Sequence, residues 1–326
     1  MNMKKIICFF ILMLLPVGAS AFIGEVVIEG IKYHLISKGR VAEVRANNYF
    51  GDVVIPSSVE YDGVEYHVEA IGEGAFRECL DLTSVSIPNS VTAIGGEAFR
   101  GCRSLHRIPI PNSVRTIGSS AFKSCSSLLE VIIPPRLTTI EGEVFAACKS
   151  LQSVAIPENV RAIEMLAFNG CTALTSVVIG KNVTKIAGLA FNRCSELTDI
   201  YLYPEEVPEI SEYTFADADL NFVKLHVPDA SIDKYKASLF GVSKTIVGLS
   251  ESPKCATPTI SYSDGRLHFG CSTEGVTYRS FIFDDEVTAH EGNEIELTRT
   301  YKVEVYATKV GFLDSDKAAV TLKWPE

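Results

Sequence analysis

The amino-acid sequence predicts an α/β-type repeat solenoid, with a parallel strand ladder and short helical turns, followed by a small all-β sandwich. Three observations predict this fold class. Six of the nine cysteines are spaced by 23 residues, and each has a Phe three positions before it and a Leu three positions after it. A fixed period of this length is typical of stacked coils that share one core. Near residue 259 the pattern changes to short alternating runs, which are typical of a β-sandwich.

The first 21 residues are predicted to be a secretory signal peptide. Lys4 and Lys5 precede an apolar run at 6–15, and small residues end the segment at 19–21. An uncleaved anchor helix is the alternative, but the apolar run is shorter than the roughly 20 residues of a membrane span. We expect cleavage near Ala21-Phe22 and no transmembrane span in the mature protein. Since these two lysines are the only charged residues removed, the net charge changes from −10 to −12.

Residues 22–49 are predicted to cap the front of the solenoid. Two strand candidates at 31–36 and 40–46 flank Ser37-Lys38-Gly39, and this arrangement is typical of a hairpin. Such a hairpin would cover the open end of the first coil.

The solenoid is predicted to span residues 50–228. Its unit is A-F-x-x-C-x-x-L-x-x-V-x-I-P-x-x-V-x-x-I-x-x-x, and the first full copy runs from 75 to 97. Val85 and Ile87 alternate with serines, which predicts a short strand with one inward face, and Pro88 ends that strand. Phe76 and Cys79 are three residues apart, so they would share a face of one helical or 3₁₀ turn. Every fixed position is therefore expected to point into the core.

An incomplete coil precedes the first full copy. Phe50, Val53 and Ile55 fall at the Leu position and at the two inward strand positions of the unit. The Asp62-Gly63 pair predicts a hairpin inserted after this coil.

The chain after the repeats is predicted to form a cap, a linker and a second domain. Ile232, Tyr235 and Leu239 predict an amphipathic helix within a cap at 229–247. Residues 248–258 are predicted to be a linker, because Gly, Ser and Pro are frequent there. Residues 259–326 are predicted to form the sandwich, with strand candidates at 259–263, 266–271, 276–283, 294–297, 301–307 and 318–324.

The repeat unit resembles the BspA-like leucine-rich repeat family of surface proteins, of the type found in Treponema and Bacteroides. The resemblance covers residues 50–228, where Phe, Cys, Leu and Ile-Pro recur together in register. It implies a leucine-rich repeat solenoid with parallel strands on one face and a role in adhesion and protein binding, without catalytic residues. Residues 259–326 are similar to the Ig-like or fibronectin-III-like modules that follow such repeats.

The cysteines fall into three groups. Cys8 lies in the signal peptide, and the six repeat cysteines occupy core positions, where we expect buried free thiols because Cys packs as a small hydrophobe. Cys255 and Cys271 flank the Asp264-Gly265 turn and belong to no repeat. They are a candidate disulfide in an exported protein, and two free thiols are the alternative.

The sequence contains no recognisable catalytic or metal-binding motif. The six histidines have no metal-ligand spacing, and the C-x-x-C, H-E-x-x-H, G-x-S-x-G and P-loop patterns do not occur. An isoelectric point near 5.2 argues against nucleic-acid binding. We therefore expect no enzyme activity, no cofactor and no metal.

The outward strand positions are the candidate ligand-binding residues. The position between the two inward strand residues of each coil defines a strand-face stripe, which we call the stripe: Ser86, Pro109, Ile132, Ala155, Val178 and Tyr201. Several of these residues are apolar, which is typical of a surface that receives a partner. The alternative is that they only reflect the preference of exposed strands for such side chains.

These observations predict a non-enzymatic secreted or cell-surface protein that binds a partner through the stripe. The expected partner is a glycan or a protein of a host cell, a neighbouring cell or the matrix. The expected location is extracellular, on the cell surface or in the periplasm. Two alternatives are a self-associating surface or periplasmic scaffold and an accessory module of carbohydrate metabolism.

Overall fold

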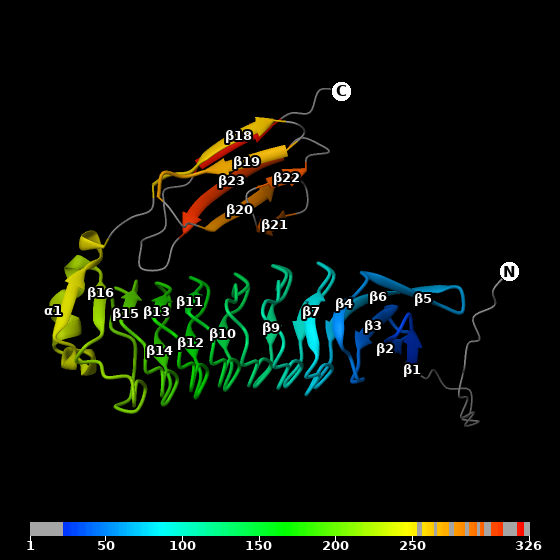
Figure 1. Cartoon of the computed structure of the whole chain (residues 1–326), viewed down its shortest axis with the longest axis horizontal. Coiled ribbons are helices and arrows are strands. Elements are labelled where there is room, and N and C mark those ends of the chain that lie inside the picture. Colours follow the sequence, from blue (N-terminus) through cyan, green and yellow to red (C-terminus); the bar gives the residue numbers. More distant parts are fainter. Residues whose placement is uncertain are drawn as a thin grey trace.

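The computed structural model describes residues 22–252, and further along the chain 256–263, 266–273, 277–283, 287–291, 294–296, 301–308 and 318–322. The predicted signal peptide lies outside the described residues. From residue 51 to residue 248 the chain winds as a β-solenoid whose coils lie side by side (Figure 1). The predicted repeat architecture is confirmed.

The coils contribute strands to two parallel ladders. Ladder A consists of β4 (Gly51–Val54), β7 (Leu82–Ser86), β11 (Ser153–Ile156), β13 (Ser176–Ile179), β15 (Asp199–Leu202), β16 (Lys224–Val227) and β17 (Thr245–Gly248). Two coils between β7 and β11 have no ladder A strand; in the first of them Pro109 has no N–H to donate to a neighbour. Ladder B consists of β6 (Val64–Ile71), β8 (Ala93–Ile94), β9 (Thr116–Ile117), β10 (Thr139–Ile140), β12 (Ala162–Ile163) and β14 (Lys185–Ile186).

Stacked side chains fill the space between the ladders. The Phe rings at positions 76 to 215 stack with centroids 4.9–5.4 Å apart and planes within 15° of parallel. Tyr49 packs on Phe76 at one end of this column and Phe240 on Phe215 at the other. The columns of Leu, Val and Ile run alongside and are buried, as the repeat unit predicts.

The turn around each Phe is not helical, in contrast to the expectation. Residues two positions before and two positions after the Phe have left-handed backbone angles, as at Glu143 and Ala147 around Phe145. A right-handed helix cannot include such residues. Single i to i+3 hydrogen bonds, such as Cys148 N–H to Phe145 O at 3.2 Å, close these turns instead.

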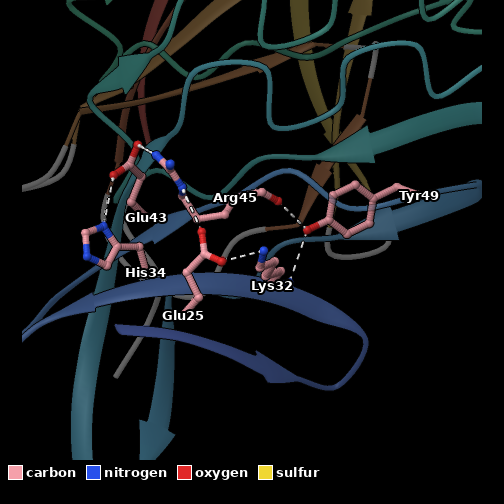
Figure 2. Close-up of polar contacts among 6 residues, drawn as sticks. All are labelled: Glu25, Lys32, His34, Glu43, Arg45 and Tyr49. Atoms are coloured by element: carbon pink, nitrogen blue, oxygen red, sulfur yellow. Dashed lines mark hydrogen bonds and ion pairs between the residues drawn. The ribbon is translucent and has the colours of Figure 1, made fainter. Parts of the chain in front are cut away.

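The N-terminal cap extends ladder B beyond the first coil. The predicted hairpin is present as β2 (Ile31–Ile36) and β3 (Val41–Val44), and β1 (Phe22–Ile28) adds a strand that was not predicted. β3 pairs in parallel with β6, and β5 (Ser58–Tyr61) forms the predicted hairpin with β6. Figure 2 shows Glu25 between Lys32 and Arg45, and Glu43 between Arg45 and His34, so both carboxylates have cationic or imidazole neighbours.

The C-terminal cap contains less helix than predicted. It has η1 (Asp229–Ser231), α1 (Ile232–Lys236) and η2 (Leu239–Val242), after which β17 adds another strand to ladder A. Tyr235 of α1 is buried and donates a hydrogen bond to Pro204 O at 2.9 Å. The short η3 (Leu249–Glu251) follows β17.

The described residues beyond 256 form two antiparallel sheets. One contains β18 (Thr259–Ser263), β19 (Arg266–Gly270) and β22 (Glu294–Glu296). The other contains β21 (Val287–Glu291), β20 (Thr277–Phe283), β23 (Tyr301–Thr308) and β24 (Ala318–Leu322). All six predicted runs overlap one of these strands, whereas β21 was not predicted.

Candidate interaction surface

The stripe lies on the outward face of ladder A. Ala155, Val178 and Tyr201 occupy successive register positions in β11, β13 and β15. At the front of the ladder, Ser86 pairs with Val54. The parallel register aligns these outward side chains, and Pro109 and Ile132 have the same place in the unit in the two coils without a ladder A strand.

The exposure of the stripe changes along the solenoid. Ser86, Pro109 and Ile132 are exposed, and Ala155 and Val178 are half-buried. Tyr201 is only 3% exposed, so the expectation that it lies on the exposed face is wrong. Its ring stacks on His226 of the next coil at 4.2 Å, and this contact buries it.

A polar cluster around His226 was missed by the sequence analysis. His226 pairs with Tyr201 in the ladder, so it extends the stripe position by one coil. Its Nε2–H donates to Asp199 Oδ1 at 2.9 Å, and its Nδ1 accepts from the Ser252 hydroxyl at 2.6 Å. Burial lowers the pKa of His226, against the opposing effect of Asp199, so the neutral ring is favoured.

This cluster has the residue types of a nucleophilic triad but not its accessibility. His226 and Ser252 are both buried, and a substrate must reach the hydroxyl of a serine nucleophile. The three residues instead hold the segment after β17 against ladder A, because Ser252 follows η3 whereas Asp199 and His226 lie in β15 and β16. The sequence signal for this cluster is that His226 stands at a position where the other coils have residues that do not titrate near neutral pH, such as Ser, Ile, Ala and Val.

Three large apolar side chains are exposed at the front of ladder A. Phe50 is 76% exposed, Val54 70% and Leu80 48%. The expectation that Phe50 fills the Leu position is wrong, because the register shift between β4 and β7 places Gly51 opposite Leu82. Gly51 has a φ of +65°, a backbone conformation that glycine adopts without strain, and Phe50 precedes this bend.

Some of the charged residues along the coils form ion pairs between neighbouring coils. In the two coils between β7 and β11, Arg107 Nη1 lies 3.1 Å from Glu130 Oε1, and these residues precede Pro109 and Ile132 by two positions. Lys181 pairs with Glu158 at 2.7 Å further along. Such exposed pairs contribute little to stability, about 0–1 kcal/mol, but they border the apolar positions with a polar rim.

The cysteines of the repeats are buried free thiols, as expected. The Cys271 thiol lies 3.1 Å from Ala256 O. Cys255 lies outside the described residues, so its pairing with Cys271 stays a prediction.

A metal site and a membrane-spanning helix are not found among the described residues. No group of three His, Cys, Asp or Glu side chains there is arranged to hold a metal ion. Within the same residues, no helix has the length and apolar character needed to cross a membrane.

The repeats of this chain are similar to those of known proteins. The profile of the BspA type leucine-rich repeat region matches residues 53–174 and 117–247, with six copies. A leucine-rich repeat protein of T. pallidum is 33% identical over 59% of this chain and 91% of its own, with a TM-score of 0.52. A leucine-rich repeat protein from Eubacterium ventriosum shares the fold at 23% identity, over 60% of this chain and 50% of its own, with a TM-score of 0.52. No curated protein sequence matches the chain. Because the matched residues make up more than half of the sequence, the chain belongs to the family of proteins with BspA type leucine-rich repeats.

Proposed function

We propose that this protein is a non-enzymatic, secreted or cell-surface protein that binds a protein or glycan partner through ladder A. The family to which it belongs consists of repeat proteins, and the outward positions of a solenoid can vary without cost to the core. A signal peptide at residues 1–21 would export it. The strands beyond residue 256 would form an Ig-like sandwich that acts as a spacer or attachment module.

The observation that carries the proposal is the exposed apolar centre of ladder A. Ile132 is 36% exposed although its coil lies in the middle of the solenoid, and Leu129 of the same coil is 41% exposed. Neither side chain belongs to the buried core. An apolar strip with a polar rim is the usual composition of a protein-binding surface.

The test is binding of the mature protein to a glycan array and to immobilised collagen, fibronectin and laminin. Ile132→Ser combined with Val178→Ser should weaken any binding detected by about tenfold or more, since a few central apolar residues dominate binding energy. Tyr201 is left intact, because its burial would make a substitution destabilising.

The matched control is Met165→Ser. Met165 is a similarly large exposed apolar residue, but it lies in the turn after β12 and not on ladder A. Binding that survives the double substitution, or that is lost equally in the control, would contradict the proposal. A mass that rises with concentration in light scattering would favour the self-associating scaffold.

A further inference from the structure

We infer that the free edge of β4 is a docking site for one extended strand of a partner protein, which pairs with β4 and presents apolar and basic side chains to it. This site is separate from the exposed centre of ladder A that carries the proposed function.

Only one edge of the β4 backbone is hydrogen-bonded to another described strand. Among the described strands β4 pairs only with β7, through bonds such as Gly51 N–H to Asp81 O at 2.8 Å and Ile55 N–H to Ser86 O at 3.0 Å. Because successive N–H groups of a strand point to opposite sides, those of Asp52 and Val54 point to the free edge. Unpaired main-chain donors and acceptors in a row are a template for another strand.

The inward side of the edge is also incompletely covered. Val53 occupies the same column as Val85 and Val154, which are 1% and 3% exposed, whereas Val53 is only half-buried. Among the described strands none of ladder A lies on that side of β4, and this explains the partial exposure of Val53. A strand added there would complete the burial of Val53.

The outward side supplies apolar contacts for the added strand. Val54 alternates with the inward Val53, Phe50 is exposed just before β4, and Leu80 is exposed in the turn before β7. Exposed edge strands of natural proteins usually carry charges or prolines that prevent pairing. Here Asp52 is the only charged side chain of β4, and its carboxylate already accepts hydrogen bonds from Ser84 at 2.6 Å and Thr83 at 2.8 Å.

Charge complementarity favours a basic strand. Residues 46–76, which contain β4 and the β5–β6 hairpin, have six carboxylates and no Lys or Arg. In the cap beside them Glu25 and Glu43 are paired (Figure 2), whereas within the described residues no ion pair involves the six carboxylates of 46–76. The hydrogen bonds from Ser84 and Thr83 lower the pKa of Asp52, so it stays ionised. A lysine opposite Asp52 would be attracted to this surface.

The geometry disfavours a second copy of the solenoid as the occupant. The other end of ladder A is β17, so a second copy would have to bring β17 against β4. Ladder B extends beyond β4 by β3, β2 and β1 (Figure 1), and α1 packs beside β17. The cap of one copy would therefore meet the C-terminal cap of the other before the two edges came together. A single strand is narrow enough to avoid this collision.

The experiment uses the mature protein and a fluorescently labelled peptide with the sequence Val-Thr-Lys-Val-Val. Its first, third and fifth side chains share one face of the extended strand. We expect saturable binding by fluorescence anisotropy that weakens at high salt. Replacing the lysine by glutamate should weaken binding. The amides of Asp52 and Val54 should become protected from hydrogen exchange when the peptide is present.

Two substitutions test the two kinds of contact separately. Val54→Pro removes one N–H that points to the free edge without removing a bond to β7, and Phe50→Ser removes apolar contact without altering the backbone or the charge. Each should weaken peptide binding by about tenfold, the effect of losing one well-formed contact. Phe222→Ser, a change at an equally exposed apolar residue far along the chain, is the matched control and should have no effect.

The outcomes separate this inference from the proposed function. The variant with Ile132→Ser and Val178→Ser should bind the peptide as the wild type does. Absence of saturable peptide binding, or unchanged binding by Phe50→Ser with its fold intact, would overturn the inference. A dimer in sedimentation that Phe50→Ser dissociates would overturn it in favour of a second copy.

Discussion

At the scale of single residues, the repeat cysteines act as hydrogen-bond donors inside the core. The thiol of Cys125 donates to Phe99 O at 3.1 Å, and Cys148 donates to Phe122 O at 3.2 Å. The same bond recurs from coil to coil, and it adds a second hydrogen bond to a carbonyl that already accepts the N–H of the Cys three residues after it. Burial raises the pKa of Cys125 to about 12, so the thiol keeps its proton at physiological pH.

His226 makes the stability of the protein depend on pH. Because burial lowers its pKa, the unfolded chain binds a proton more readily than the folded protein. The stabilising contribution of the neutral ring is complete above the ordinary His pKa of about 6.5 and decreases as the pH falls through the folded value. Urea unfolding from pH 8 to pH 5 should show that the advantage of the wild type over His226→Gln shrinks with acidity.

The control for this prediction is His106→Gln. His106 is exposed and lies three residues before Pro109 in the same coil, so its removal should leave the pH profile of the wild type unchanged. Parallel profiles for the wild type and His226→Gln would contradict the role of His226.

At the scale of elements, backbone contacts between the turns of neighbouring coils determine the spacing between those coils. A Cβ added to Gly118 would lie 2.4 Å from the backbone nitrogen of Gly96 in the preceding coil. Nothing at that contact is a flexible side-chain end, so the coils themselves would have to move apart. The glycine is therefore required for packing and not for its backbone angles.

Gly118→Ala should lower the free energy of unfolding by about 1–3 kcal/mol, the usual cost of overpacking. Gly96→Ala is the matched control, because its added Cβ would lie 3.4 Å from Ser119 O, an ordinary contact. Its effect should be below about 1 kcal/mol. Equal losses in urea unfolding of the two variants would show that coil spacing is not the cause.

At the scale of the whole molecule, the solenoid is a one-dimensional stack. Each Phe ring contacts its neighbours at 4.9–5.4 Å, and each ladder strand pairs with adjacent coils. Stability in such a stack is approximately the sum of the coils and of the interfaces between neighbours.

Removal of one complete period should therefore leave a folded, shorter solenoid. Deletion of residues 116–138 joins Arg115 to Thr139, which has the same place in the unit as Thr116. Circular dichroism should show native β-structure and cooperative unfolding. Deletion of 116–137 moves the junction by one position, puts inward residues on the outward face and should prevent folding of that region. Equal folding of both variants would contradict the strict 23-residue stacking.

The sequence alone determined the period, the columns of the core and both hairpins at the front of the solenoid. These features could be predicted because each coil repeats the same local pattern, so a residue such as Phe145 has the same surroundings as Phe122. The strands beyond residue 256 also followed from alternation of apolar and polar residues.

The tertiary structure decided which outward residues are accessible. Tyr201 and Ile132 have the same place in the unit. Tyr201 is buried because His226 of the next coil stacks on it, whereas Ile132 is exposed. Phe50 matched a core position by spacing but was turned outward by the register shift at Gly51. Periodicity specifies the inward face of every coil, whereas exposure depends on contacts between coils and at the two ends, where the repeat stops.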